Sequence, residues 1–173
     1  PSLCENSDME AFVPFLVFCQ SLGALVGALS AVLGELAYVR AMKNGKISDA
    51  EQAHLRTIGR GLKYGMTLLL LASLGLTIAA YQAGGTLQPA LTPSYWTLIA
   101  LALTVIGVCS ALSRGKMSFP LASASLFGAW WFLVYLSFGW LSLSFGAAVM
   151  SFVIATAIFY AVLYYARLIA SPR

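Results

Sequence analysis

The sequence predicts an all-α fold, a polytopic membrane helical bundle with five transmembrane helices. Two observations lead to this prediction, namely the composition and the distribution of charge. Of the 173 residues, 60% are hydrophobic and only 9% are charged, whereas a soluble domain carries roughly 25% charged residues. The ten Lys and Arg residues border hydrophobic segments, where they are typical of membrane-topology signals. This pattern excludes a soluble enzyme and a nucleic-acid-binding domain, and the lipid bilayer is the expected surrounding.

The uncharged intervals of the chain predict the number of spans. Residues 11–34 carry no charge, and neither do the longer intervals 64–113 and 117–166. One helix needs about 20 apolar residues, because it crosses hydrocarbon about 30 Å thick at about 1.5 Å per residue. Each longer interval therefore holds two helices, separated by Gly and Pro near residues 83–93 or by Gly and Ser near residues 139–146. We expect one membrane domain, 1–173, with spans at about 12–36, 62–82, 94–113, 119–138 and 146–167.

The basic residues also predict the orientation of the chain. They flank the first and third connections and the C-terminus, whereas the second and fourth connections carry no charge. Basic residues collect on the cytoplasmic side of membrane proteins. The sequence therefore predicts a multi-pass protein of the cell membrane, with its N-terminus outside and its C-terminus in the cytoplasm.

The first connection has the pattern of a cytoplasmic helical hairpin over residues 37–61. Asn44-Gly45 is typical of a helix end, and Ser48 to Glu51 has the pattern of a capping box that begins the next helix. Three basic residues share one face of the second arm and are candidates for contact with anionic lipid or a protein partner: Arg56, Arg60 and Lys63.

Three residues of this region could together bind one metal ion. Glu51 and His54 have the i, i+3 spacing found in carboxylate-bridged metal bundles, and Glu35 ends the first span nearby. We favour a structural role, in which Glu51 caps its helix and Glu35 pairs with Arg56 or Arg60. His54 is the only histidine in the chain, so a bis-histidine haem is excluded and no cofactor is expected.

Small residues and aromatic residues form two further patterns. Gly23-Gly27-Ala31 and Gly61-Gly65 recur at four-residue spacing, which predicts close helix–helix contacts in lipid. The aromatic cluster around Trp130-Trp131 is expected to anchor the bundle in lipid and at its interface. The alternative is an aromatic wall of a groove for a hydrophobic ligand. We expect the hydroxyl groups within the spans to bond within or across helices and not to line a pore.

One stretch of the sequence resembles a pattern in small uncharacterised bacterial multi-pass inner-membrane proteins. It comprises Glu35-Leu36, Asn44-Gly45-Lys46-Ile47-Ser48, Glu51 and the run from Gly61 through Leu68 and Leu71 to Ser73. The resemblance implies a location in the bacterial inner membrane. It implies no particular activity.

Three classes of function fit these features. We expect a channel or transporter for a small solute or ion, working as a homo-oligomer because five spans enclose little volume. The alternatives are an accessory or assembly subunit that docks on a membrane-protein partner, and a metal- or lipid-binding protein that uses the hairpin. The sequence has no Ser-His-Asp set, Walker loop or zincin motif, which argues against an enzyme. A membrane enzyme built on Tyr, Ser and Arg stays an open alternative.

The predicted orientation is testable by labelling single cysteines in a cysteine-free background. Cysteines at Thr86 and Ser144 should react with a membrane-impermeant reagent in intact cells. Cysteines at Asn44 and Lys116 should react only after permeabilisation, because the positive-inside rule places them in the cytoplasm. Reaction at Asn44 in intact cells would show that the orientation is inverted.

Overall fold

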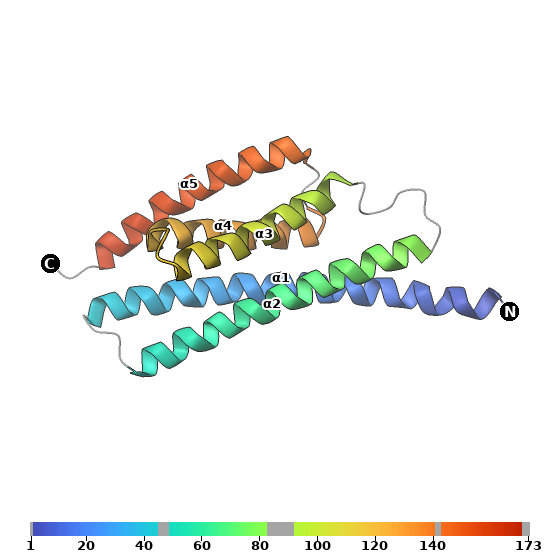
Figure 1. Ribbon diagram of the computed structural model, residues 1–173, viewed down its shortest axis with the longest axis horizontal. Helices are drawn as coiled ribbons and strands as arrows, with labels where there is room; N and C mark the ends of the chain where they lie inside the picture. The colour runs from blue at the N-terminus through green and yellow to red at the C-terminus, as the bar shows by residue number, and fades with distance from the viewer. Residues whose placement is uncertain (1, 45–48, 83–91, 141–142, 171–173) are drawn as a thin grey trace.

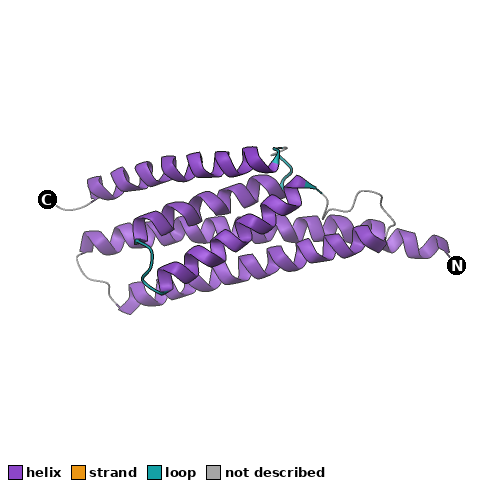
Figure 2. Cartoon of the chain, turned by 45° about the horizontal axis from the view of Figure 1, so that its top comes forward, coloured by secondary structure: helices purple, strands orange, loops and turns teal. Residues whose placement is uncertain are grey.

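The computed structural model describes residues 2–44, 49–82, 92–140 and 143–170, and these segments form a bundle of five α-helices. Their order along the chain is α1 (Ser2–Asn44), α2 (Asp49–Gln82), α3 (Pro93–Ser113), α4 (Phe119–Ser137) and α5 (Phe145–Ala170). Figure 2 shows that all regular structure in these segments is helical. The all-α prediction is therefore confirmed.

Each helix contains a segment that is long and apolar enough to cross a membrane. These five segments agree with the predicted spans to within a few residues at most ends: 12–41, 57–82, 93–113, 119–137 and 145–169. The first helix differs from expectation because it begins at Ser2, ten residues before the predicted span, and continues through Pro14. The first and second helices meet where expected, with α1 ending at Asn44 and α2 beginning at Asp49. Ser48, the predicted cap, lies outside the described residues.

The helices run alternately up and down the bundle, so the two ends of the chain lie at opposite ends of the molecule (Figure 1). Helices α1 and α2 form a long antiparallel pair, and α4 packs on α1. Helix α3 packs mainly against α4, and α5 lies outermost against α4. We call the end where α1 meets α2 the hairpin end. It also holds the α3–α4 turn and the end of α5, and we call the opposite end the N-terminal end.

The backbones of α1 and α2 touch where the sequence places small residues. A Cβ atom added at Gly23 would lie 2.7 Å from the Leu69 nitrogen and 2.9 Å from the Gly65 oxygen. One added at Gly65 would lie 2.9 Å from the Gly27 nitrogen. Only glycine, which has no Cβ atom, allows the two helix backbones to lie this close together. The predicted contact between small residues is confirmed for this pair of helices.

The centre of the bundle is filled by Trp130 of α4, whose side chain is fully buried beside Leu69 and Leu133. The ring lies directly over Gly27 of α1, where any added Cβ would collide with it. The expectation that the aromatic cluster faces lipid is therefore wrong for Trp130, since the missing side chain at Gly27 makes room for an indole. Trp140, by contrast, is exposed, as an anchoring residue would be.

The short α3–α4 turn depends on a glycine in the left-handed region. Gly115 has φ +65°, and its amide donates to the Leu112 carbonyl at 3.1 Å. The Lys116 amide donates to the Ala111 carbonyl at 2.9 Å. This pair of hydrogen bonds is a Schellman motif, which ends a helix and reverses the chain. The same arrangement ends α4 at Gly139, where φ is +69°.

The close α1–α2 contact predicts a selective effect of adding one methyl group. Gly65→Ala should destabilise the protein by about 1–3 kcal/mol, because the new Cβ meets backbone that cannot yield locally. Gly107→Ala is the matched control, since nothing lies within 4 Å of a Cβ at that position. Thermal unfolding of both variants in detergent measures the difference. Equal stability of the two variants would contradict the contact.

Candidate functional site

Glu35 of α1 and Arg167 of α5 form a buried ion pair between the first and last helices. The Nη2 atom of Arg167 donates to both carboxylate oxygens of Glu35, at 2.8 and 2.7 Å. The two side chains are only 8% and 12% exposed for Arg167 and Glu35, respectively. A charge inside a membrane span is costly unless it is paired. The ion pair therefore lowers the free-energy cost of burying both Glu35 and Arg167.

Three further side chains surround the guanidinium group. Its Nη2 atom also donates to the hydroxyl oxygen of Ser123 on α4. The rings of Tyr38 and Phe119 stack on one another with centroids 4.2 Å apart. The Cζ atom of Arg167 lies 5.0 Å from the Tyr38 centroid and 5.3 Å from the Phe119 centroid, which is within the range of cation–π attraction.

The helical repeat explains how these residues meet. Glu35 and Tyr38 are three residues apart on α1, and Phe119 and Ser123 are four apart on α4, so each pair shares one helix face. Arg167 lies in the last turn of α5, where the helix dipole favours a cation. Three helices thus contribute one site at the hairpin end.

The guanidinium group has more donors than acceptors around it. The Nε and Nη1 atoms of Arg167 are buried and have no hydrogen-bond partner among the described residues. The Nη2 atom donates all three hydrogen bonds described above. A buried donor without a partner costs about 1–3 kcal/mol. The site can therefore accept a further oxygen ligand.

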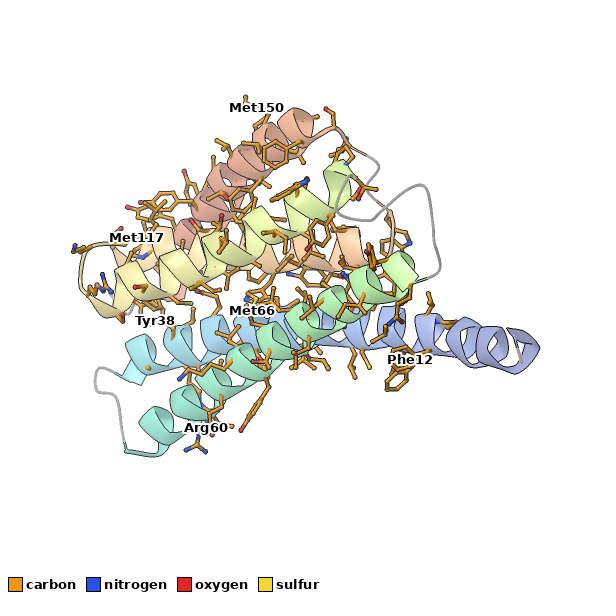
Figure 3. All side chains as sticks on the ribbon, turned by 45° about the vertical axis from the view of Figure 1, so that its right-hand side comes forward. Phe12, Tyr38, Arg60, Met66, Met117 and Met150 are labelled. Atoms are coloured by element: carbon orange, nitrogen blue, oxygen red, sulfur yellow. The ribbon has the colours of Figure 1, made fainter. Side chains whose placement is uncertain are left out.

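The structure gives Glu35 a partner, Arg167, that the sequence did not predict. Arg60 is exposed and points away from the bundle in Figure 3, and the side chain of Arg56 lies outside the described residues. Sequence reasoning used Arg167 only as a topology signal. The sequence does contain a signal for the pairing, because Arg167 lies inside the apolar segment of α5, Phe145–Ile169. An arginine in such a segment requires a partner.

The structure does not test the proposed metal site, because it describes the side chain of Glu35 only among the three proposed ligands. No group of three His, Cys, Asp or Glu residues that could hold a metal ion occurs in the described part of the chain. The side chains of Glu51 and His54 lie outside it, so a site that includes them stays a prediction. The same holds for contact of the basic face with anionic lipid, for which the structure shows only that Arg60 and Lys63 are exposed.

Two clefts lie at opposite ends of one four-helix interface formed by α1 to α4. The hairpin-side cleft has a volume of about 360 Å³, and the N-side cleft has a volume of about 460 Å³. The polar residues of the hairpin-side cleft include Ser30, Glu35, Ser113 and Ser123, and Cys109 also lines it. Those of the N-side cleft include Gln20, Ser73, Thr77, Ser94 and Tyr95.

A layer of buried side chains separates the two clefts. On each of the four helices, buried core residues fall between the residues that line one cleft and those that line the other, and on α3 the core residue Leu98 also lines the N-side cleft. On α2, for example, Met66 and Leu69 lie between Leu62 of the hairpin-side cleft and Ser73 of the N-side cleft. Trp130 fills the centre of this layer. We call this layer the apolar barrier.

The polar groups of the N-side cleft are linked by hydrogen bonds across α1 and α2. Gln20 donates from Nε2 to the Ser73 hydroxyl oxygen at 3.1 Å, and Ser73 donates to the Leu69 carbonyl at 2.8 Å. Thr77 donates to the carbonyl of Ser73 at 3.0 Å. Several hydroxyls thus bond within their own helix, as the sequence predicted. The amide of Gln20 connects the two helices.

Comparison with known protein families, with curated proteins and with solved structures finds no match for this chain. The resemblance to small bacterial membrane proteins therefore gains no support from these comparisons.

The ion pair predicts a non-additive pattern of stability. Arg167→Gln and Glu35→Gln should each destabilise the protein, by about 3 kcal/mol for the arginine, because one buried charge loses its partner. The double variant should lose less than the sum of the two. Thermal or denaturant unfolding in detergent measures this.

Arg60→Gln is the control, because an exposed charge should change stability by no more than about 0.5 kcal/mol. Additive losses at Glu35 and Arg167, or coupling of Glu35 to Arg60 instead, would contradict the observed pairing.

Proposed function

We propose that the protein is a membrane transporter for a small solute and that the hairpin-side cleft opens to the cytoplasm. The observation that carries this proposal is the pair of clefts at opposite ends of the α1–α4 interface, separated by the apolar barrier. A carrier needs access from each side and a barrier between them, and this arrangement supplies both in one set of helices. Each cleft also contains polar groups that can hold a solute.

The barrier favours a carrier over an open channel. Trp130, Leu69 and Leu133 have no exposed side-chain surface within it. A solute can pass only if the helices move relative to one another. Because α5 is tied to α1 by Glu35 and Arg167, exchange of that ion pair is one way in which such a movement could be controlled.

The orientation in this proposal follows from the basic residues. Arg40, Arg114 and Lys116 are exposed at the hairpin end, and Arg60 and Lys63 are exposed on α2 between that end and Gly65. The positive-inside rule places this end, and with it the C-terminus, in the cytoplasm. The N-side cleft then opens to the outside, and the resemblance noted above supports the bacterial inner membrane as the location.

An accessory subunit is the alternative function, and the structure offers less in its favour. Its main support is the apolar outer face of α5, where Ile158, Val162 and Ile169 are exposed. Lipid covers such a face equally well. Docking also gives no reason for two clefts with polar groups on either side of a barrier.

Thiol labelling tests whether the clefts admit water from opposite sides. Cys109, left as the only cysteine, should react with an impermeant reagent from the cytoplasmic side, and Thr77→Cys in a cysteine-free chain should react from the outside. Leu103→Cys is the control, since this α3 residue is exposed and lines neither cleft. If neither cleft cysteine reacts faster than the control, the proposal is overturned.

Solute flux tests transport itself. Liposomes containing the full-length protein should re-swell faster than empty liposomes in at least one of three solutes, namely glycerol, glycine or sodium methanesulfonate, as measured by light scattering. Trp130→Ala should raise the flux, because it opens the centre of the apolar barrier. Absence of flux for all three solutes in the wild type and in Trp130→Ala would overturn the proposal.

A further inference from the structure

We propose that the hairpin-side cleft binds an organic monoanion, specifically a carboxylate with an apolar body, which pairs with Arg167 in place of Glu35. The inference deepens the transport proposal and rests on it for the statement that this anion is the transported solute. Binding itself is argued from the geometry of Arg167, Glu35 and Ser123 and from the walls of the cleft.

Arg167 has hydrogen-bond donors that no described residue uses. Arginine has five N–H donors and no acceptor, yet every hydrogen bond described for Arg167 is donated by Nη2. Its Nε and Nη1 atoms are buried and lack a partner within the described segments. The residue as a whole is 7% exposed. A ligand with two acceptor oxygens and a negative charge matches these donors.

Both hydrogen-bond partners of Arg167 in the described residues also line the cleft. Glu35 and Ser123 both bind Nη2, and both belong to the cleft wall. An anion in the cleft therefore meets a carboxylate that it can replace on the guanidinium, with no change in the charge of the pair. Ser123 accepts a hydrogen bond from Arg167, so its own O–H can be donated to the incoming oxygen.

Arg167 is also held by contacts that do not depend on Glu35. The rings of Tyr38 and Phe119 lie within cation–π range of its Cζ atom, and such contacts hold a cation without neutralising it. The guanidinium can therefore keep its place while the acceptor is exchanged. Glu35 is the member of the ion pair that lines the cleft and is the one expected to move.

The walls of the cleft define the rest of the ligand. Apart from the polar groups named above, they are apolar and include Ala31, Ile58, Leu62, Leu112 and Leu126. A volume of about 360 Å³ suits a small molecule and not a peptide. An organic cation that took Glu35 would leave Arg167, which does not line the cleft, buried without its counter-charge. An anion that takes Arg167 displaces Glu35 instead, and this side chain lines the cleft and can turn into it. The cleft therefore favours an anion.

Calorimetric titration of the full-length protein in phosphatidylcholine nanodiscs tests the proposal, with sodium hexanoate as the probe. Hexanamide and hexylammonium have the same apolar chain but lack the negative charge. Hexanoate should bind saturably and at least about tenfold more tightly than either, which corresponds to the loss of one charged hydrogen bond. Equal binding of the three compounds, or preference for hexylammonium, would overturn the proposal.

Two variants separate anion exchange from a purely structural ion pair. Glu35→Gln keeps the shape of the side chain but removes the competing charge, so hexanoate should bind more tightly. Ser123→Ala should weaken binding several-fold, because one donor is lost. Lys116→Gln is the control, since it removes an exposed cation in the α3–α4 turn and should leave the affinity unchanged.

Glu35→Gln and Ser123→Ala both keep Arg167, so they test the proposal even if Arg167→Gln does not fold. Weaker hexanoate binding in Glu35→Gln than in the wild type would overturn the exchange with Glu35. If Lys116→Gln loses as much affinity for hexanoate as Ser123→Ala does, hexanoate binds through general surface charge. This result would also overturn the proposed site.

A carboxylate can reach the site from water or from the membrane, and two further measurements distinguish these sources. If oleate in the nanodisc competes with hexanoate, the site also accepts a membrane-resident acid; if it does not, the site takes the soluble acid alone. Either result supports the anion site. Hexanoate binding without flux of any solute would overturn transport and leave the site supported. Flux of glycerol or glycine without hexanoate binding would overturn the anion site alone.

Discussion

The arrangement of α5 depends on the Glu35–Arg167 ion pair more than on any other contact. This helix packs mainly against α4 and lies at the edge of the bundle, with much of its surface exposed. Apolar packing against lipid and against protein differ little in energy within a bilayer. An unpaired arginine in a span, by contrast, costs about 2.5–3.5 kcal/mol even on the scale derived from insertion experiments. The pairing of Arg167 therefore selects one rotation and one position for α5.

The two clefts follow from how α1 and α2 cross. Gly23 and Gly65 bring the backbones together near the middle of the pair, and the two helices diverge on either side of this crossing (Figure 1). Long helices that cross at an angle can pack closely only near the crossing point. The indole of Trp130, seated over Gly27, fills the space at that level. The glycine contact, the apolar barrier and the clefts are thus parts of one geometry.

The polarity of the clefts is concentrated in a few groups. Many hydroxyls in the spans donate to carbonyls of their own helix, as Thr97 and Thr104 do at 2.8 Å, so they have little capacity left for a solute. Glu35, Ser123 and Gln20 instead make contacts between helices and lie at the cleft walls. These are the groups whose partners must change if the helices move. For that reason the transport proposal and the anion inference both centre on interhelical contacts.

The sequence by itself determined five spans, the helix ends near Asn44 and Asp49, and the small-residue contact of α1 with α2. These features depend on local hydropathy, on segment length and on residue size, all of which can be read along the chain. Only the tertiary structure decided that Glu35 pairs with Arg167, and that Trp130 is buried while Trp140 is exposed. Nearly uniform apolar helices carry little information about which face turns inward. That choice depends on packing and on charge pairing between residues far apart in the chain.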